Sequence, residues 1–128
     1  MNSDGPHLTA DLAVTLDEDH PGTLARAIGC VSGDGINIEG YAEIGGMVHI
    51  LAEDLRATHR CLERSGFRII QEQRVVVVPV ADEAGAAARV FQKIAEAHIN
   101  VRYSYLATGN RLVIASSNPQ AVLAAVGS

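Results

Sequence analysis

The stretch His20-Pro21-Gly22-Thr23-Leu24, followed by a helical pattern and then by Ile36-Asn37-Ile38, returns 63 residues further along this chain. The second copy begins Glu83-Ala84-Gly85-Ala86-Ala87 and leads, without insertion, to Ile99-Asn100-Val101. A repeat at this period indicates two related structural units. Units of about 60–65 residues bury little surface alone, so we expect them to share a core. The seam between two such units is a natural place for a ligand.

The composition restricts the class of protein. The chain has 128 residues, 48% of them hydrophobic, which is enough for one compact body with a core. Its net charge is −5 and its ten Lys and Arg residues form no basic block, which argues against a nucleic-acid or membrane surface. No apolar stretch has the length of a membrane span, and residues 1–11 lack the features of a signal peptide. We therefore expect a cytoplasmic protein.

The first repeat has the periodicities of two helices and four strands. Apolar residues alternate over 11–16, which predicts a strand with one buried face, and the helix that follows Pro21 ends at the glycines of 33–35. Further strands are predicted from Ile36 to Gly40, over Met47–Leu51 and over Phe67–Gln71, with a helix capped by Asp54 and ended by Gly66.

The second repeat follows the same plan but is shorter. Val75–Val78 is a continuous apolar run, typical of a strand covered on both faces. A helix, two strands and a last helix follow, the last helix with Asn118 as its cap and Pro119 at its first position. We place the two strands at Ile99–Leu106 and Arg111–Ser116.

These elements predict an α+β fold with two ferredoxin-like βαββαβ units, the second lacking its last strand. We expect a loose tail over residues 1–10, a first domain over 11–73 and a truncated second domain over 74–128. In the strand order 4-1-3-2, the missing strand would leave Val75–Val80 as a bare apolar edge, and such edges are paired or covered in proteins. We expect residues 1–10, another chain or a rearranged strand order to cover it.

At this point the sequence resembles the ACT domain, a small regulatory module. The resemblance lies in Asp19-His20-Pro21-Gly22-Thr23-Leu24 with Ile28, followed by Gly35-Ile36-Asn37-Ile38. It is weaker in the second copy, which has Glu83-Ala84 before its glycine. The resemblance implies a pair of modules that senses an amino acid. It also implies a ligand at the module interface, between the turn after the first strand of one module and the second strand of its neighbour.

The residue chemistry supports such a site. The start of a helix offers unpaired N–H groups to a carboxylate, and Gly22 lets a ligand approach the backbone. Asp19, or its neighbours Asp17 and Glu18, supplies a negative charge for an ammonium group, and Asn37 offers both a donor and acceptors. With the resemblance, this gives the predicted ligand-binding residues, which are Asp19, His20, Pro21, Gly22, Thr23, Leu24, Ile36, Asn37, Ile38 and Asn100.

Plainer structural roles stand beside these assignments. Pro21-Gly22 is also a common tight turn. Asn37 is equally suited to bonding its own backbone at the end of a strand, and His20 to capping the helix or facing solvent.

The sequence offers little support for catalysis, a metal or a cofactor. Its histidines form no ligand pattern with cysteines or with one another, so we expect neither a metal nor a cofactor. Cys30 and Cys61 lie in helical patterns and suit small core positions, with a disulfide as the less favoured alternative. No convergent acid–base pair is evident, which disfavours a small ferredoxin-like enzyme.

We therefore expect a regulatory protein that binds a small amino acid or a related metabolite and performs no chemistry. It would act as a homodimer or through a separate regulated enzyme. The alternative is a dimerisation or protein-interaction module that binds no ligand.

Overall fold

The chain forms two compact units, seen in the computed structural model, which describes residues 5–16 and 21–127. The first-repeat unit comprises Ala10–Gln73. The second-repeat unit comprises Arg74–Ser128 together with Met1–Thr9. Within the described ranges, no helix is both long enough and apolar enough to cross a membrane.

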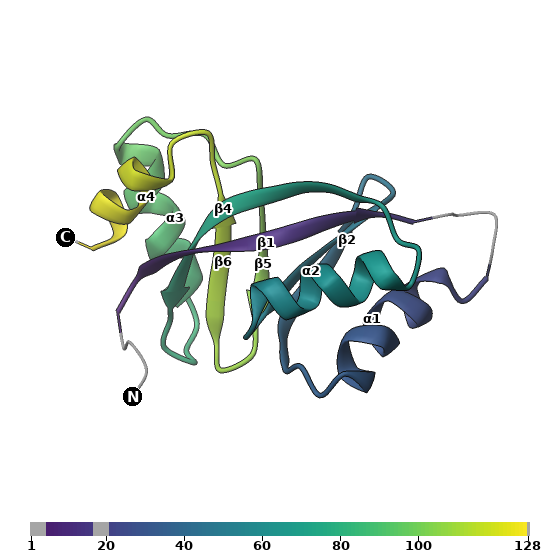
Figure 1. Ribbon diagram of the computed structural model, residues 1–128. Helices are drawn as coiled ribbons and strands as arrows, with labels where there is room; N and C mark the ends of the chain where they lie inside the picture. Colours follow the sequence, from purple (N-terminus) through teal and green to yellow (C-terminus); the bar gives the residue numbers. More distant parts are fainter. Residues whose placement is uncertain (1–4, 17–20, 128) are drawn as a thin grey trace. The chain divides into compact units, whose positions relative to one another are not determined.

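The first-repeat unit contains two helices and strands in the order β2-β3-β1-β4 (Figure 1). β3 pairs antiparallel with both β1 and β2. The elements are β1 (His7–Thr15), α1 (Thr23–Gly33), β2 (Ile38–Ile44), β3 (Met47–Ala52), α2 (Leu55–Arg64) and β4 (Ile69–Pro79). β1 and β4 continue beyond this unit into the second-repeat unit.

The second-repeat unit has strands in the order β1-β4-β6-β5 and two helices. β6 pairs antiparallel with both β4 and β5. Its remaining elements are α3 (Ala86–Glu96), β5 (Tyr103–Ala107), β6 (Arg111–Ala115) and α4 (Pro119–Val126). The predicted α+β fold with βαββαβ-like repeats is confirmed.

The N-terminal segment corrects one prediction. Residues 1–10 were expected to be a loose tail, but β1 begins at His7. Residues 7–9 belong to the second-repeat unit, where β1 is the hydrogen-bonded neighbour of β4. Leu8 packs against the core of this unit. Residues 7–9 therefore lie beside β4, in the position of the missing fourth strand. Of the three expected ways to cover the Val75–Val80 edge, this is the one that uses the N-terminal segment.

Strand boundaries differ from the prediction in further places, and β2 spans Ile38–Ile44 rather than Ile36 to Gly40. The segments Phe67–Gln71 and Val75–Val80 were expected to be separate strands, but β4 runs without a break from Ile69 to Pro79. The intervening residues Glu72-Gln73-Arg74 contain no glycine or proline that would interrupt it. β5 begins at Tyr103 rather than at Ile99, because Ile99 and Val101 pack against the core before strand pairing starts.

Two predicted helix caps are present. The Asp54 side chain accepts a hydrogen bond from the Ala57 amide at 3.0 Å, and α2 follows. The Asn118 side chain accepts one from the Ala121 amide at 3.2 Å, with Pro119 opening α4. Each cap satisfies an amide that the helix itself leaves unpaired.

Each unit has its own apolar cluster between its helices and one face of its strands. In the first-repeat unit, Leu12, Val14, Val48, Ile50 and Leu62 have no exposed surface. In the second-repeat unit, the eight-residue helix α4 covers part of the corresponding cluster. The buried residues of this cluster are Val76, Val78, Ile94, Leu112, Ile114, Val122 and Val126. The other face of β4 is covered too, since Val75 and Val77 are at most 1% exposed, as the apolar run predicts.

A buried acid–histidine pair joins two strands of the first-repeat unit. His49 on β3 lies opposite Ala13 of β1, and its Nδ1 is 3.6 Å from Oδ1 of Asp11. The Asp11 side chain has no exposed surface and that of His49 only 6%. A carboxylate is rarely found so deep without a partner, and His49 supplies one.

Because residues 7–9 belong to the second-repeat unit, substitutions at Leu8 and Thr9 should change the free energy of unfolding by different amounts. Leu8→Ala should lower the free energy of unfolding by about 1–2 kcal/mol, less than for a fully buried leucine, because Leu8 is only partly buried. Thr9→Ser, at the exposed neighbouring position, should change it by less than about 0.5 kcal/mol. Urea denaturation of both variants checks this. Equal midpoints for the two variants would contradict the assignment of this segment to the core.

Candidate functional site

The turn that opens the first helix has the same backbone conformation in both repeats. Gly22 precedes α1 with φ 90° and ψ 0°, and Gly85 precedes α3 with φ 87° and ψ −8°. Both glycines are left-handed, a conformation in which a Cβ is strained. The repeat seen in the sequence therefore extends to the backbone geometry where each helix begins.

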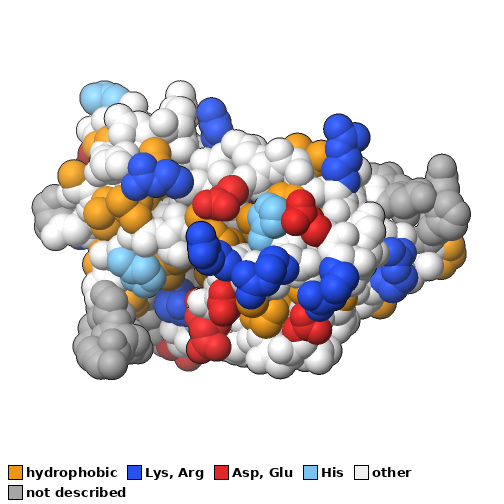
Figure 2. Space-filling view, in the orientation of Figure 1, with side chains coloured by type: hydrophobic (Ala, Val, Ile, Leu, Met, Phe, Trp, Pro, Cys, Tyr) orange, Lys and Arg blue, Asp and Glu red, His pale blue; other side chains and the backbone are white. Residues whose placement is uncertain are grey.

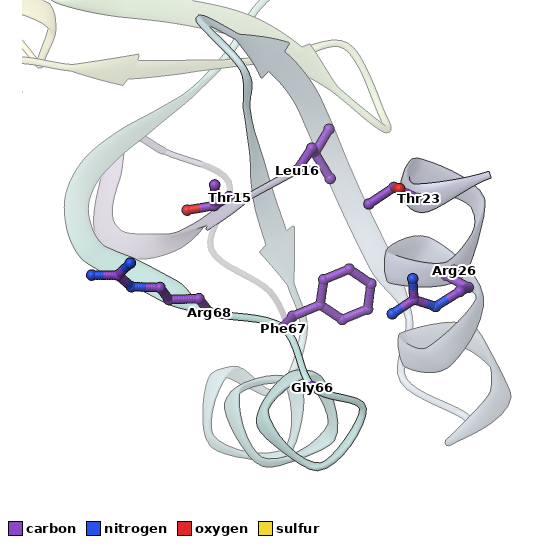
Figure 3. A pocket seen from close by; sticks show the side chains of 7 residues that line it. All are labelled: Thr15, Leu16, Thr23, Arg26, Gly66, Phe67 and Arg68. Atoms are coloured by element: carbon purple, nitrogen blue, oxygen red, sulfur yellow. The ribbon is translucent and has the colours of Figure 1, made fainter. Parts of the chain in front are cut away.

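A cavity of about 340 Å³ lies beside the start of α1 (Figure 3). Its walls come from the end of β1, from α1 and from the segment before β4. The lining residues are Thr15, Leu16, Thr23, Arg26, Gly66, Phe67 and Arg68. This volume is at the lower end of the range of about 300–1,000 Å³ for ligand pockets, which suits a small ligand.

Arg26 gives the cavity its distinctive chemistry. Its guanidinium carbon lies 4.7 Å from the centre of the Phe67 ring, a cation–π arrangement that holds the side chain over the ring (Figure 3). Among the residues that the structure describes, no carboxylate forms an ion pair with Arg26. Thr23, the first residue of α1, is 7% exposed. A positioned guanidinium beside a helix N-terminus can bind a carboxylate through two parallel hydrogen bonds.

The second repeat has a related but different cavity. It measures about 230 Å³ and is lined by Pro79, Val80, Ala81, Ala86, Arg89, Val90 and Lys93. Arg89 stands 63 residues after Arg26, and Ala86 replaces Thr23. Here Nη2 of Arg89 donates to Oε2 of Glu83 at 2.8 Å. The repeat thus keeps the basic side chain, but an internal carboxylate pairs with it and the threonine hydroxyl is lost.

The structure separates the predicted ligand-binding residues into three groups. Thr23 lines the first cavity, next to the exposed Pro21-Gly22 turn. Leu24, Ile36 and Ile38 pack against the apolar cluster of the first-repeat unit and do not line the cavity. Asn37 and Asn100 are exposed and also lie outside the linings, while Asp19 and His20, like Asp17 and Glu18, lie outside the described residues.

Asn37 has a structural role whatever its side chain binds. Its backbone oxygen accepts a hydrogen bond from the Glu53 amide at 3.0 Å, which ties the entrance of β2 to the end of β3. Its role toward a ligand stays a prediction.

The sequence reasoning missed Arg26, Phe67 and Arg68 as lining residues. A signal for Arg26 was available, since the 63-residue offset that relates Gly22 to Gly85 also relates Arg26 to Arg89. Phe67 and Arg68 gave none, because they follow the second helix and reach the cavity only when the chain folds back beside β1. The Thr15 amide donates to the Arg68 carbonyl at 3.2 Å and fixes this approach.

The surface charge agrees with the composition. On the face drawn in Figure 2, Asp and Glu side chains lie close to the Lys and Arg side chains, so both signs of charge are present.

Comparison with solved structures gives full-length matches. Protein BT0572 from Bacteroides thetaiotaomicron is 19% identical with a TM-score of 0.78, over 94% of this chain and 88% of that chain. The ligand-free regulatory subunit of aspartate kinase from Thermus thermophilus is 17% identical with a TM-score of 0.64, over 95% and 93%. Escherichia coli aspartokinase III in complex with lysine and aspartate is 15% identical with a TM-score of 0.58, over 92% of this chain and 31% of that enzyme.

These matches define the class of fold. The sequence matches no protein-family model and no curated protein. The chain nevertheless has the fold of aspartate kinase regulatory subunits along nearly its whole length. The resemblance to a tandem pair of ACT modules is therefore confirmed at the level of the fold.

Replacing glycine by alanine should change the free energy of unfolding in opposite directions at Gly22 and at Gly29. Gly22→Ala should lower the free energy of unfolding by about 1–2 kcal/mol, because its φ of +90° strains any Cβ. Gly29→Ala, inside α1 with open space around the added methyl group, should raise it by about 0.5–1 kcal/mol. Thermal and urea denaturation measure both. The same sign for the two variants would show that the Gly22 turn is not required.

Proposed function

We propose that this protein is a regulatory protein that binds a small amino acid or a related metabolite and performs no chemistry of its own. It acts in the cytoplasm, either on a separate enzyme or through a second copy of itself. The regulatory subunits that share its fold along their whole length support the non-catalytic assignment.

The observation that carries the proposal is the cavity at the start of α1. It is lined by Arg26 and by Thr23, the first residue of α1. A guanidinium, a hydroxyl and the N-terminus of a helix each suit a carboxylate. Gly22, the residue before Thr23, is exposed. An α-amino acid supplies a carboxylate together with an ammonium group, for which the acidic residues of the β1–α1 turn remain the predicted partners.

Both repeats have an arginine at the same position, which supports a role for Arg26 in the site. Arg89 occurs at the repeat position of Arg26 and lies beside a cavity at the start of α3. Since Glu83 already pairs with Arg89, we propose that the ligand's carboxylate binds the first-repeat unit and that the second-repeat cavity is not its site.

Regulation then follows from differential binding. A ligand that binds one arrangement of the protein more tightly than another shifts the population toward it. The aspartokinase III structure with lysine is one precedent for a small amino acid bound by an enzyme that contains this fold. The proposal that ligand binding takes place at an interface of modules rests on the ACT resemblance.

A ligand panel tests the proposal. Thermal unfolding of the full chain is followed with each of the twenty amino acids in turn. A ligand present at 100 times its dissociation constant adds about 2.7 kcal/mol to stability, which raises the melting temperature by several degrees. The amino acid that gives this shift is then titrated by calorimetry.

Two arginine variants form a matched pair for that titration. Arg26→Ala should weaken binding roughly 10- to 100-fold, the loss expected for a charged hydrogen-bond partner. Arg89→Ala, at the same position of the second repeat, should leave the affinity within about twofold. Equal effects of the two variants would contradict the assignment to the first-repeat unit, and a lack of response to every amino acid would contradict the proposed function.

A ligand-free interaction module is the second candidate, and two exposed side chains favour it. Leu106 on β5 is 66% exposed and Tyr41 on β2 is 51% exposed, and each strand is the last in its unit's order. Edge strands with exposed apolar side chains are suited to pairing with another chain. Analytical ultracentrifugation of the wild type and of Leu106→Lys tests this, since dimerisation through β5 would be weakened by the charge.

A further inference from the structure

Two cysteines from different helices meet in the first-repeat unit. Cys30 lies on α1 and Cys61 on α2, and their sulfur atoms are 3.1 Å apart. This separation is about 1 Å longer than a disulfide bond, so only a small movement separates the two thiols from covalent contact. Both are free thiols in the structure. Neither lines the cavity beside α1.

The hydrogen bonds assign different roles to the two thiols. The Cys61 thiol donates to the Cys30 sulfur, and the Cys30 thiol donates to the Ala27 carbonyl at 3.3 Å. A Cys30 thiolate would therefore keep a donor pointing at it. Cys61 is 1% exposed, whereas Cys30 is half-buried. Cys30 is thus the thiol that a dissolved reagent reaches first.

The surroundings of Cys61 keep it protonated. Burial, and then its hydrogen bond to Cys30, raise the pKa of Cys61 to about 12. Two charged groups lie nearby, Asp34 after the end of α1 and Arg64 at the end of α2. They pair with each other through Arg64 Nη2 and Asp34 Oδ2 at 2.6 Å. The ion pair joins the same two helices as the thiols, and so helps to hold the two sulfur atoms together.

We propose that Cys30 and Cys61 form a reversible intramolecular disulfide that joins α1 to α2, with a low-molecular-weight disulfide as the oxidant. The Cys30 thiolate attacks one sulfur of that oxidant, whose S–S bond breaks, and the first leaving thiolate takes up a proton. Cys61 then loses its proton and attacks the Cys30 sulfur, which releases the second thiol. Two S–H groups become one S–S bond, and the oxidant gains the two electrons and two protons.

This pair has the character of a redox-sensing site rather than of a structural disulfide. Structural disulfides are rare in reducing compartments, where the disulfides that do form are usually transient. Cys30 is the more accessible of the two thiols and lies next to Cys61, which can act as the resolving thiol, as in reversible thiol sensors. The cross-link closes a loop between two neighbouring helices, so it should stabilise the oxidised protein against unfolding.

The test equilibrates the folded, full chain with oxidised glutathione, followed by an acid quench, alkylation with N-ethylmaleimide and intact mass measurement. We expect the oxidised protein to lose the mass of two hydrogen atoms, to accept no alkylating reagent and to remain a single chain on a non-reducing gel. Peptide mapping should join Cys30 to Cys61, and dithiothreitol should restore both thiols. The oxidised form should melt on the order of 5–10 °C above the reduced form.

Two alanine variants test the order of the steps. Cys61→Ala should retain one glutathione on Cys30, because the resolving thiol is gone. Cys30→Ala should stay unmodified while folded, because Cys61 is buried, and should become modified in urea. The proposal fails if the protein treated while folded still has two alkylatable thiols once it is unfolded in urea, if the disulfide is intermolecular, or if Cys61→Ala takes up no glutathione.

Discussion

The structure depends on two strands that each serve both repeats. β1 contributes Ala10 to Thr15 to the first-repeat unit and His7 to Thr9 to the second, and β4 is divided in the same way. A ferredoxin-like unit needs a fourth strand beside its first, because an uncovered apolar edge pairs with other chains. The second repeat has no such strand of its own, so the start of the chain supplies it. The second-repeat unit is therefore built from two separate segments of sequence, whereas the first-repeat unit is the single segment Ala10–Gln73.

The two copies of the repeat share one backbone turn at the helix start but differ in the side chains around it. The left-handed glycine is kept in both, since the turn into α1 and into α3 requires it. The side chains around it are free to change. Arg26 stacks on Phe67, whereas Arg89 pairs with Glu83, which occupies the repeat position of His20. The two copies therefore have the same backbone turn with different chemistry beside it.

Much of the fold follows from local patterns. The alternation over 11–16, the caps Asp54 and Asn118, and the apolar run Val75–Val78 each predict what the structure contains, because each depends on neighbours along the chain. The continuity of β4 and the presence of residues 7–9 in a strand could not be predicted in this way, since both depend on strand pairing between distant segments. The cavity was only partly predictable: Thr23 lies in the repeated motif, but Phe67 and Arg68 reach it through tertiary structure alone.

The two proposals meet on one helix. Arg26 lines the cavity and Cys30, one helical turn later, contacts Cys61 of α2. A cross-link at Cys30 would restrict how α1 moves against α2, and the position of α1 sets where the Arg26 guanidinium lies. A ligand that requires α1 in its present position would bind the cross-linked protein without the entropic cost of ordering that helix. A ligand that requires α1 to shift would be excluded by the same bond. The sign of the coupling between thiol oxidation and ligand affinity would therefore report whether the cavity beside α1 is already in its binding conformation.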